Sequence, residues 1–313
     1  SMNNDLLAAK KKRNVKRGLF IASFISIPIL HFLVFTVFVN LDTIALSFET
    51  FSNQQGKYVF VGLRNYKEFF ASFSSPGSVM GKAIRNSLLF FALNDFVILP
   101  LSFLSAFFMY KKMPLSNTFR IIFFMPSIIS TVVLTMLYSF MFDSSIGIID
   151  SFMKLIGRGD SIPELGWFGD KHTAMPVLLF YCVWVGIGSN VVLISGAMSR
   201  IPTEMIEAGR LDGMTLTREM VSVTLPLTGS LLATLMMLGV PVIFTLFLQP
   251  MLITGGGPDG ETYTIALYIV TAIRNENNLT MGAAVGILCA LIGTPLVVIL
   301  RKIVGKTFPD YEY

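Results

Sequence analysis

Residues 201–226 read IPTEMIEAGRLDGMTLTREMVSVTLP and form the most polar run between two long apolar segments. Pro202 suits the first position of a helix, where its missing N–H would have no helical partner. Gly213 suits the end of that helix, and Thr215 can cap a second helix that runs to Thr224. These residues predict a short helix, a sharp turn and a second helix. By physics alone, an ordinary amphipathic connector and a rigid docking element fit equally well.

The composition around this stretch indicates a membrane protein. Of 313 residues, 53% are hydrophobic and 14% are charged, whereas soluble domains carry about 25% charged residues. The mean hydropathy is +0.69. The charges cluster between apolar segments of about 20 residues, the length that crosses a hydrocarbon core. We therefore predict an all-α, polytopic membrane protein with six transmembrane helices. The predicted spans are 18–39, 86–110, 120–142, 175–198, 227–253 (broken by Pro241) and 281–304.

The distribution of Lys and Arg predicts which side each loop faces. Six spans place both termini on one side, where the segments carry 15 Lys and Arg residues, against nine in the longer loops opposite. Positive residues favour the cytoplasmic side, so both termini and residues 201–226 are expected in the cytoplasm. The predicted units are a cytoplasmic basic arm (1–17), the first span with an external loop (18–85), a core transmembrane domain (86–304) and a cytoplasmic tail (305–313).

Motif searches argue against an enzyme. Residues 305–307 (GKT) imitate the end of a nucleotide-binding P-loop, but Leu300 stands where that motif needs a glycine. We therefore expect no cofactor in this chain. Cys182 and Cys289 lie inside apolar segments, as small buried side chains do. The two histidines are far apart, so no metal site is predicted. The basic residues flank the apolar runs, which favours membrane anchoring over nucleic-acid binding.

The spacing within residues 207–226 resembles a known loop. The order is EAG (207–209), three residues, Gly213, nine residues, Val223, one residue and Leu-Pro. This spacing resembles the EAA loop of ABC importer permeases. Gly209 replaces the second Ala of that pattern and Val223 replaces Ile, while Met214 stands where Ala is common. The loop also precedes the penultimate predicted span, as it does in that family.

Two further stretches narrow the resemblance to carbohydrate-type permeases. LITGGGP at 252–258, followed by Thr262, Leu267 and Tyr268, resembles their external signature. VGLRNY at 61–66 resembles the segment before the second span in the first permease of maltose or multiple-sugar systems, and residues 120–126 also look like that family. The resemblance covers nearly the whole chain.

The resemblance implies the transmembrane domain of a type I ABC importer in a bacterial inner or plasma membrane. The implied partners are a second homologous permease, two ATP-binding subunits that hold ATP and Mg, and an external solute-binding protein. The EAA loop would form the coupling helix that docks into a cleft of the ATPase. The residues matching its core are Glu207, Ala208, Gly209, Asp212 and Gly213.

Polar and aromatic side chains inside the spans are candidates for the substrate path, because polar groups in a span tend to face the bundle interior. Sugars offer C–H faces to aromatic rings and hydroxyls to amides. For each residue the alternative is a role in packing between helices. Asp95 is the only carboxylate expected inside a span, and it could also pair with the second permease. The candidates are Asp95, Tyr181, Trp184, Asn190, Thr245 and Gln249.

Three alternatives to a sugar importer remain open. A polyol or glycerol-phosphate-type solute would use the same machinery, but a phosphate ester favours intramembrane Arg or Lys, and we find none. An ion-coupled secondary transporter favours inverted repeats and several intramembrane carboxylates, and only one candidate Asp is present. A membrane scaffold has no need of the EAA spacing. Among sugars, the resemblance favours an oligosaccharide.

Overall fold

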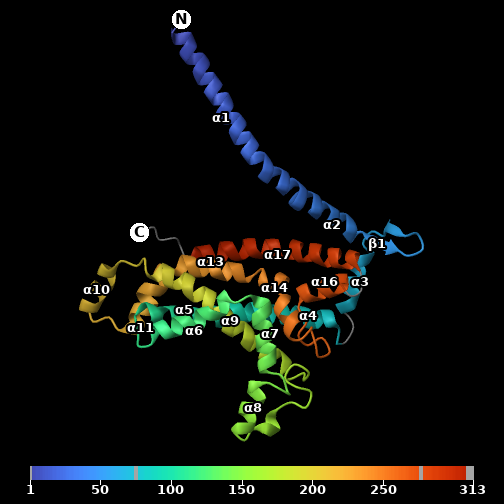
Figure 1. The fold of residues 1–313 in the computed structure, drawn as a ribbon, viewed down its shortest axis with the longest axis vertical. Helices are drawn as coiled ribbons and strands as arrows, with labels where there is room; N and C mark the ends of the chain where they lie inside the picture. Colours follow the sequence, from blue (N-terminus) through green and yellow to red (C-terminus); the bar gives the residue numbers. More distant parts are fainter. Residues whose placement is uncertain (1, 74–76, 275–277, 308–313) are drawn as a thin grey trace.

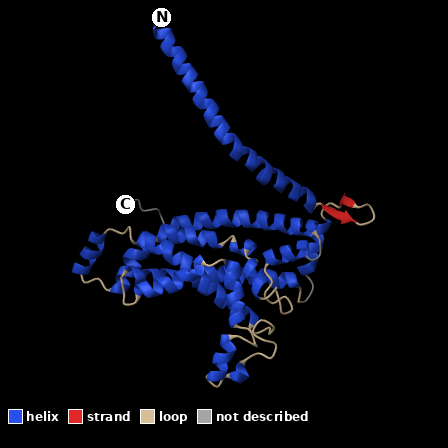
Figure 2. Cartoon of the chain, viewed as in Figure 1, coloured by secondary structure: helices blue, strands red, loops and turns tan. Residues whose placement is uncertain are grey.

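A computed structural model describes residues 2–73, 77–274 and 278–307. The described chain is a helical bundle with a single two-stranded hairpin, β1 (Glu49–Ser52) and β2 (Lys57–Phe60), paired antiparallel. Figure 1 shows that the N-terminal helix α1 projects away from the bundle, and Figure 2 shows how small the share of strand is. The predicted all-α membrane fold is therefore confirmed, with the hairpin as its only described β structure.

The N-terminal part consists of α1 (Met2–Phe32), η1 (Leu33–Phe38), α2 (Val39–Ser47), the hairpin and α3 (Arg64–Phe73). The bundle continues with α4 (Val79–Leu93), η2 (Asn94–Ile98), α5 (Leu99–Tyr110), α6 (Ser116–Ile128), α7 (Thr131–Met141), α8 (Ile148–Leu155), η3 (Gly159–Ser161) and α9 (Ala174–Met198). The last part holds α10 (Thr203–Leu211), α11 (Leu216–Glu219), η4 (Met220–Thr224), α12 (Leu225–Leu227), α13 (Gly229–Gly239), α14 (Val242–Thr245), α15 (Leu248–Ile253), α16 (Ile265–Arg274) and α17 (Leu279–Thr307).

Within the described residues, four helices are long and apolar enough to cross a membrane, and two bent helix pairs raise the number to six. The long helices are Lys16–Ser47, Val79–Tyr110, Ala174–Met198 and Leu279–Ile303, and the bent pairs are Ser116–Ile128 with Thr131–Met141 and Leu216–Leu227 with Gly229–Thr245. The predicted number of six spans fits this count. The chain is a multi-pass membrane protein.

The first predicted span ends too early, and the second begins too late. Helix continues from Met2 through Ser47, so the loop expected from residue 40 starts later. The second span begins at Val79, where Ser78 accepts a hydrogen bond of 3.1 Å from the N–H of Gly81 and caps the helix. Each extension contains charged residues, Asp42 in the first and Lys82 and Arg85 in the second, which end an apolar count. The short amphipathic helix expected at 61–70 is present as α3.

The third predicted span is not one straight helix, because α6 and α7 meet at 109°. Pro126 cannot donate a hydrogen bond within the last turn of α6, which weakens that turn. Ile129 and Ser130 then adopt extended backbone, with ψ of 140° and 133°, and helix resumes at Thr131. The predicted span 120–142 is therefore corrected to a bent pair.

The fifth predicted span is interrupted in more places than Pro241. Its largest bend, 69°, lies at Thr228, whose hydroxyl donates a hydrogen bond of 2.7 Å to the carbonyl of Thr224. Such back-bonding by Thr bends helices. Helix also stops at Leu246, where the backbone is extended. Thr245 on α14 and Gln249 on α15 therefore do not lie on one continuous helix, as the predicted span 227–253 would place them.

Two π-helical segments lie directly before prolines. Segment η2 precedes Pro100, and η4 precedes Pro226. A proline ring clashes with the carbonyl four residues earlier in a regular α-helix, and a π turn widens the helix at that place. The α11–α12 helix thus continues through Pro226 to Leu227, past the end expected at Thr224.

Glycines on α9 let neighbouring helices pack closely. A Cβ on Gly188 would overlap the carbonyl oxygen of Phe123 in α6, and one on Gly186 would press on the side chain of Ile98 in η2. Small residues allow such approach between helices in membranes. Helix α9 is therefore the central helix of the largest apolar core, which it shares with α5 and α13.

A network of polar contacts holds the loop 254–264 against α4. The Nδ2 of Asn86 donates to the carbonyls of Glu261 and Tyr263, at 2.7 and 2.9 Å. Lys82 forms an ion pair of 2.8 Å with Glu261, and Arg85 forms one of 3.0 Å with the same carboxylate. Since Glu261 is mostly covered, this network should fix the loop more firmly than an exposed ion pair could.

We expect Glu261→Gln to lower stability by about 1 kcal/mol at neutral pH. The hydrogen bond from Lys82 holds the pKa of Glu261 below its usual range, with Arg85 adding to the effect. A carboxylate with a lowered pKa stabilises the fold above its usual pKa, and this stabilisation is lost as the pH falls through the folded-state pKa. Thermal unfolding in detergent at several pH values measures it. Glu68→Gln, in the exposed pair with Arg64, is the matched control; equal effects of both variants would contradict the prediction.

Candidate functional site

Helix α10 lies at one end of the bundle, beyond the ends of the long helices (Figure 1). Pro202 is its N-cap, with φ −57° and ψ 128°. The helix therefore begins at Thr203, one residue after the proline that the sequence predicted as its first position. Ile201 and Ile206 are both 6% exposed and join the apolar core shared with α5, α9 and α13. These two isoleucines fix the base of α10.

The turn after α10 has the predicted form. Gly213 has φ +76°, and its N–H donates to the carbonyl of Arg210 at 3.0 Å. The N–H of Met214 donates to the carbonyl of Gly209 at 2.9 Å. These two bonds form a Schellman motif, which needs a left-handed residue at the glycine position. Thr215 then caps α11 by accepting from the N–H of Arg218 at 3.4 Å.

The outer side of this helix-turn-helix exposes apolar side chains between acidic ones. Leu211 is 90% exposed, Met205 45% and Leu216 46%. Glu207 and Asp212 lie exposed beside them. We call these five residues the α10 surface. Exposed apolar side chains held on a rigid turn suit a surface that docks into a partner.

The two departures from the EAA pattern inside the first helix and turn contact each other. A Cβ on Gly209 would overlap the terminal methyl group of Met214. The longer side chain at position 214 therefore occupies the space left by the missing methyl at position 209. The sequence signal was available, because both positions depart from the pattern together, but only the turn geometry brings them into contact.

A buried ion pair joins the second helix of the turn to α5. Lys111 and Glu219 are paired, with side chains only 9% and 4% exposed. The Lys111 Nζ also lies 5.6 Å from the ring centre of Tyr110 and 5.8 Å from that of Phe107, within the range of cation–π attraction. This pair was not predicted from the sequence, where Lys111 contributed only to the charge count that orients the spans.

Tyr181 and Trp184 come together on α9, in an aromatic cluster that also includes Tyr138 of α7. The ring of Tyr181 lies 5.0 Å from that of Tyr138 and 6.5 Å from that of Trp184. The Tyr138 hydroxyl donates to the carbonyl of Val177 at 2.7 Å. The Tyr181 hydroxyl is buried and has no hydrogen-bond partner among the described residues. The sequence analysis did not select Tyr138, because its proximity depends on the bend before α7.

Asp95 lies elsewhere, between η2 and α13. Its side chain is 5% exposed, and Oδ1 accepts a hydrogen bond of 2.9 Å from Nδ2 of Asn94. A Cβ on Gly239 would overlap that carboxylate oxygen, so Asp95 is packed on the backbone of α13.

The remaining substrate-path candidates lie on α9, α14 and α15. Thr245 is exposed, and its hydroxyl donates to the carbonyl of Pro241, whereas Asn190 and Gln249 are half-buried.

Comparison with known proteins places this geometry in a family. The family model described as "Binding-protein-dependent transport system inner membrane component" matches residues 98–308. The chain is 26% identical to the probable ABC transporter permease protein YurN of Bacillus subtilis, over 88% of this chain and 93% of that protein. It is 25% identical to the diacetylchitobiose uptake system permease protein NgcF of Streptomyces coelicolor, over 95% of this chain and 86% of that protein.

A solved structure shares the fold. The crystal structure of the bacterial alginate ABC transporter in complex with alginate pentasaccharide-bound periplasmic protein contains a chain that matches with a TM-score of 0.81 and 17% identity. The match covers 96% of this chain and 99% of that one. The predicted resemblance to carbohydrate-type ABC importer permeases is confirmed. The family is one of transport subunits and not of enzymes.

Within the described residues, no group of three or more His, Cys, Asp or Glu side chains could hold a metal ion.

We expect Gly209→Ala and Met214→Ala to be non-additive. The first variant gains helix propensity of about 1 kcal/mol but displaces the Met214 side chain, and the second leaves the gap at Gly209 open. The double variant should be more stable than the sum of the singles predicts, by about 1 kcal/mol. Melting temperature and the rate of proteolysis within residues 201–226 measure this. The exposed Ala208 supplies the control: Ala208→Gly combined with Met214→Ala should be additive. Additivity in both cycles would refute the contact.

We expect Lys111→Met to cost about 3 kcal/mol, because it leaves the Glu219 carboxylate buried without its partner. Adding Glu219→Leu should recover more than half of that loss, since no charge then remains buried. Lys112→Met, at the exposed neighbouring position, should change little. Melting temperature of the purified protein in one detergent separates these outcomes. Similar melting temperatures for the Lys111→Met and Lys112→Met variants would show that the pair does not stabilise the fold.

Proposed function

Because this chain belongs to the family of binding-protein-dependent transport system inner membrane components, we propose that it forms one membrane-spanning half of an ATP-driven importer that carries a sugar into the cytoplasm. A second, homologous permease forms the other half. Two separate subunits bind ATP and Mg, and an external solute-binding protein delivers the sugar. The chain needs such partners, since we find no nucleotide-binding motif in its own sequence.

An oligosaccharide is the substrate class that we favour. Two similar proteins support this choice. One is named as part of a diacetylchitobiose uptake system, and the other was solved in complex with an alginate pentasaccharide-bound periplasmic protein. The aromatic cluster of Tyr138, Tyr181 and Trp184 adds a physical argument. Rings can stack on the C–H faces of a sugar, and the unbonded hydroxyl of Tyr181 can bond a sugar hydroxyl once α7 and α9 move apart.

The observation that carries the coupling role is the α10 surface. A leucine that is 90% exposed on a rigid turn gains about 1.5–3 kcal/mol when a partner covers it. The proposed orientation has α10 and both termini in the cytoplasm, and the excess of Lys and Arg on that side supports it. The ATP-binding subunits would then receive the α10 surface in a cleft. Their closure on ATP would move α10 and shift the two permeases between inward-open and outward-open states.

Helix α9 provides the mechanical link in this proposal. It carries Tyr181 and Trp184 in its first half, and only four residues separate its end at Met198 from the start of α10 at Thr203. A displacement at the docked surface therefore reaches the proposed sugar path through one packed helix. Asp95, packed on α13, would stabilise the neighbouring helices or pair with the second permease.

We expect Leu211→Asp to abolish sugar-stimulated ATP hydrolysis, because burying an unpaired carboxylate opposes docking. The assay uses the reconstituted transporter with its external binding protein and a panel of mono- and oligosaccharides, with glycerol-3-phosphate included. Co-purification of the ATP-binding subunits should fall at least tenfold. Leu63→Asp, 58% exposed near the start of α3, should leave co-purification unchanged. Full stimulation in the Leu211→Asp variant would end the docking proposal, and no stimulation by any sugar would end the substrate assignment.

A further inference from the structure

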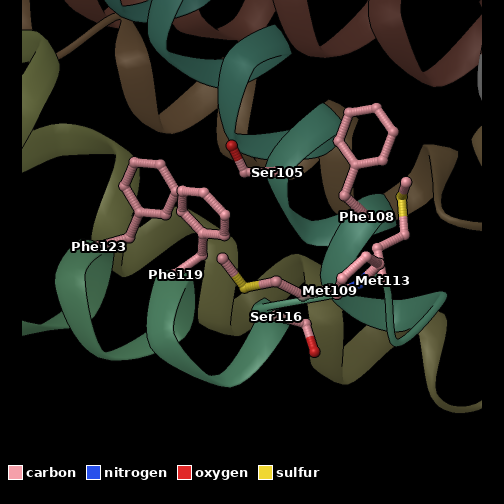
Figure 3. A pocket seen from close by; sticks show the side chains of 8 residues that line it. Ser105, Phe108, Met109, Met113, Ser116, Phe119 and Phe123 are labelled. Carbon is pink, nitrogen blue, oxygen red and sulfur yellow. The ribbon is translucent and has the colours of Figure 1, made fainter.

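An apolar groove lies at the corner between α5 and α6. It has a volume of 380 Å³ and is lined by Ser105, Phe108, Met109, Met113, Pro114, Ser116, Phe119 and Phe123. Figure 3 shows Phe119 and Phe123 on α6, Phe108 on α5 and Met113 on the corner, with Met109 toward the space between the two helices. The rings of Phe119 and Phe123 stack, with centres 6.2 Å apart.

The groove is open to its surroundings, since Phe108 is 45% exposed, Phe119 47% and Met113 39%. Its two walls belong to segments apolar enough to lie in a membrane, so we infer that the groove faces lipid. An apolar groove of this size between spans can take a segment of one acyl chain. Its lining offers few polar groups to hold a soluble ligand.

A cationic cavity adjoins the groove in the sequence, since Tyr110, Lys111 and Lys112 line it and Met109 and Met113 line the groove. It has a volume of 230 Å³ and is lined by Tyr110, Lys111, Lys112, Thr203, Ile206, Glu207 and Arg210. Three of these side chains are cations and one is a carboxylate. Lys111 is already paired with Glu219, whereas Lys112 and Arg210 are exposed. This cavity therefore favours a negatively charged group.

We propose that the groove and the cationic cavity together bind one anionic phospholipid, with an acyl chain along Phe119 and Phe123 and the phosphate at Lys112 and Arg210. The apolar groove and the cations lie on adjoining residues of one turn, as the chain and headgroup of a lipid require. Lys and Arg at such positions bury their stems in the apolar region and keep their charges at headgroup level. Each Lys or Arg near an anionic surface adds about fivefold to binding.

The lipid would link the membrane to the coupling loop. Thr203, Glu207 and Arg210 belong to α10, so a phosphate in the cavity lies at the base of the α10 surface. A bound headgroup would neutralise the cations around Glu207 and so change the charge that the α10 surface presents to a partner. This consequence rests on the proposed coupling role and orientation, whereas the binding of the lipid itself rests only on the groove and the cavity.

The experiment is native mass spectrometry of the co-purified transporter in a neutral detergent. Phosphatidylglycerol and phosphatidylcholine with the same acyl chains are titrated separately. We expect phosphatidylglycerol to bind at least tenfold more tightly. Lys112→Gln should weaken phosphatidylglycerol about fivefold and leave phosphatidylcholine unchanged, while Ser105→Leu, which fills the groove, should weaken both. Lys302→Gln, an exposed lysine on α17, is the matched charge control and should bind as the unmodified chain does.

Several results would overturn the proposal. Equal binding of the two lipids, or unchanged binding in both the Lys112→Gln and Ser105→Leu variants, would mean that only bulk lipid surrounds the protein. A groove that takes up no lipid in the assembled transporter would mean that a partner chain fills it. Displacement of the lipid by millimolar inorganic phosphate would mean that the groove contributes nothing. The measurement needs neither ATP nor sugar, so its failure leaves the transport proposal standing, and the reverse also holds.

Discussion

The packing of α9 against its neighbours is the contact on which the rest of the structure depends. Gly186 and Gly188 bring η2 and α6 close to this helix, and at Gly188 a Cβ would overlap the backbone of α6. In a membrane the surrounding lipid is as apolar as the side chains, so close van der Waals packing replaces the hydrophobic drive of a soluble core. Because α9 leads directly into α10, the same packing also sets where the α10 surface lies.

The irregular backbone of this bundle coincides with its buried charges. Asp95 lies within η2, and Glu219 directly precedes η4. Each of these two π-helical segments is followed, after one residue, by a proline that a regular helix would not accommodate. Backbone distortion in a membrane is tolerated where protein covers it, and both carboxylates lie in such covered places, Asp95 on the backbone of α13 and Glu219 beside Lys111. The two distorted segments therefore mark where α4 and α11 are tied to other helices.

Local chemistry predicted much of this structure. The number of spans followed from apolar length, and the turn after α10 followed from Gly213 and Thr215, whose backbone and capping preferences act within a few residues. The bends at Ile129 and Thr228 could not be predicted in the same way, because their direction depends on the helices packed around them. For the same reason Tyr138 and the Lys111–Glu219 pair escaped the sequence analysis: each depends on two segments that only the bent helices bring together.

The α10 surface combines an exposed tip with an immobile base, and this contrast is what a coupling element requires. Leu211 at the tip is 90% exposed, whereas Ile201, Ile206 and Glu219 at the base are each no more than 6% exposed. A loose base would absorb any displacement of the tip as local bending. Here the base is attached to α9 through the chain and to α5 through a buried ion pair. A force on the tip must therefore move two spans together, and since α9 carries the aromatic cluster, the rearrangement reaches the interior of the bundle.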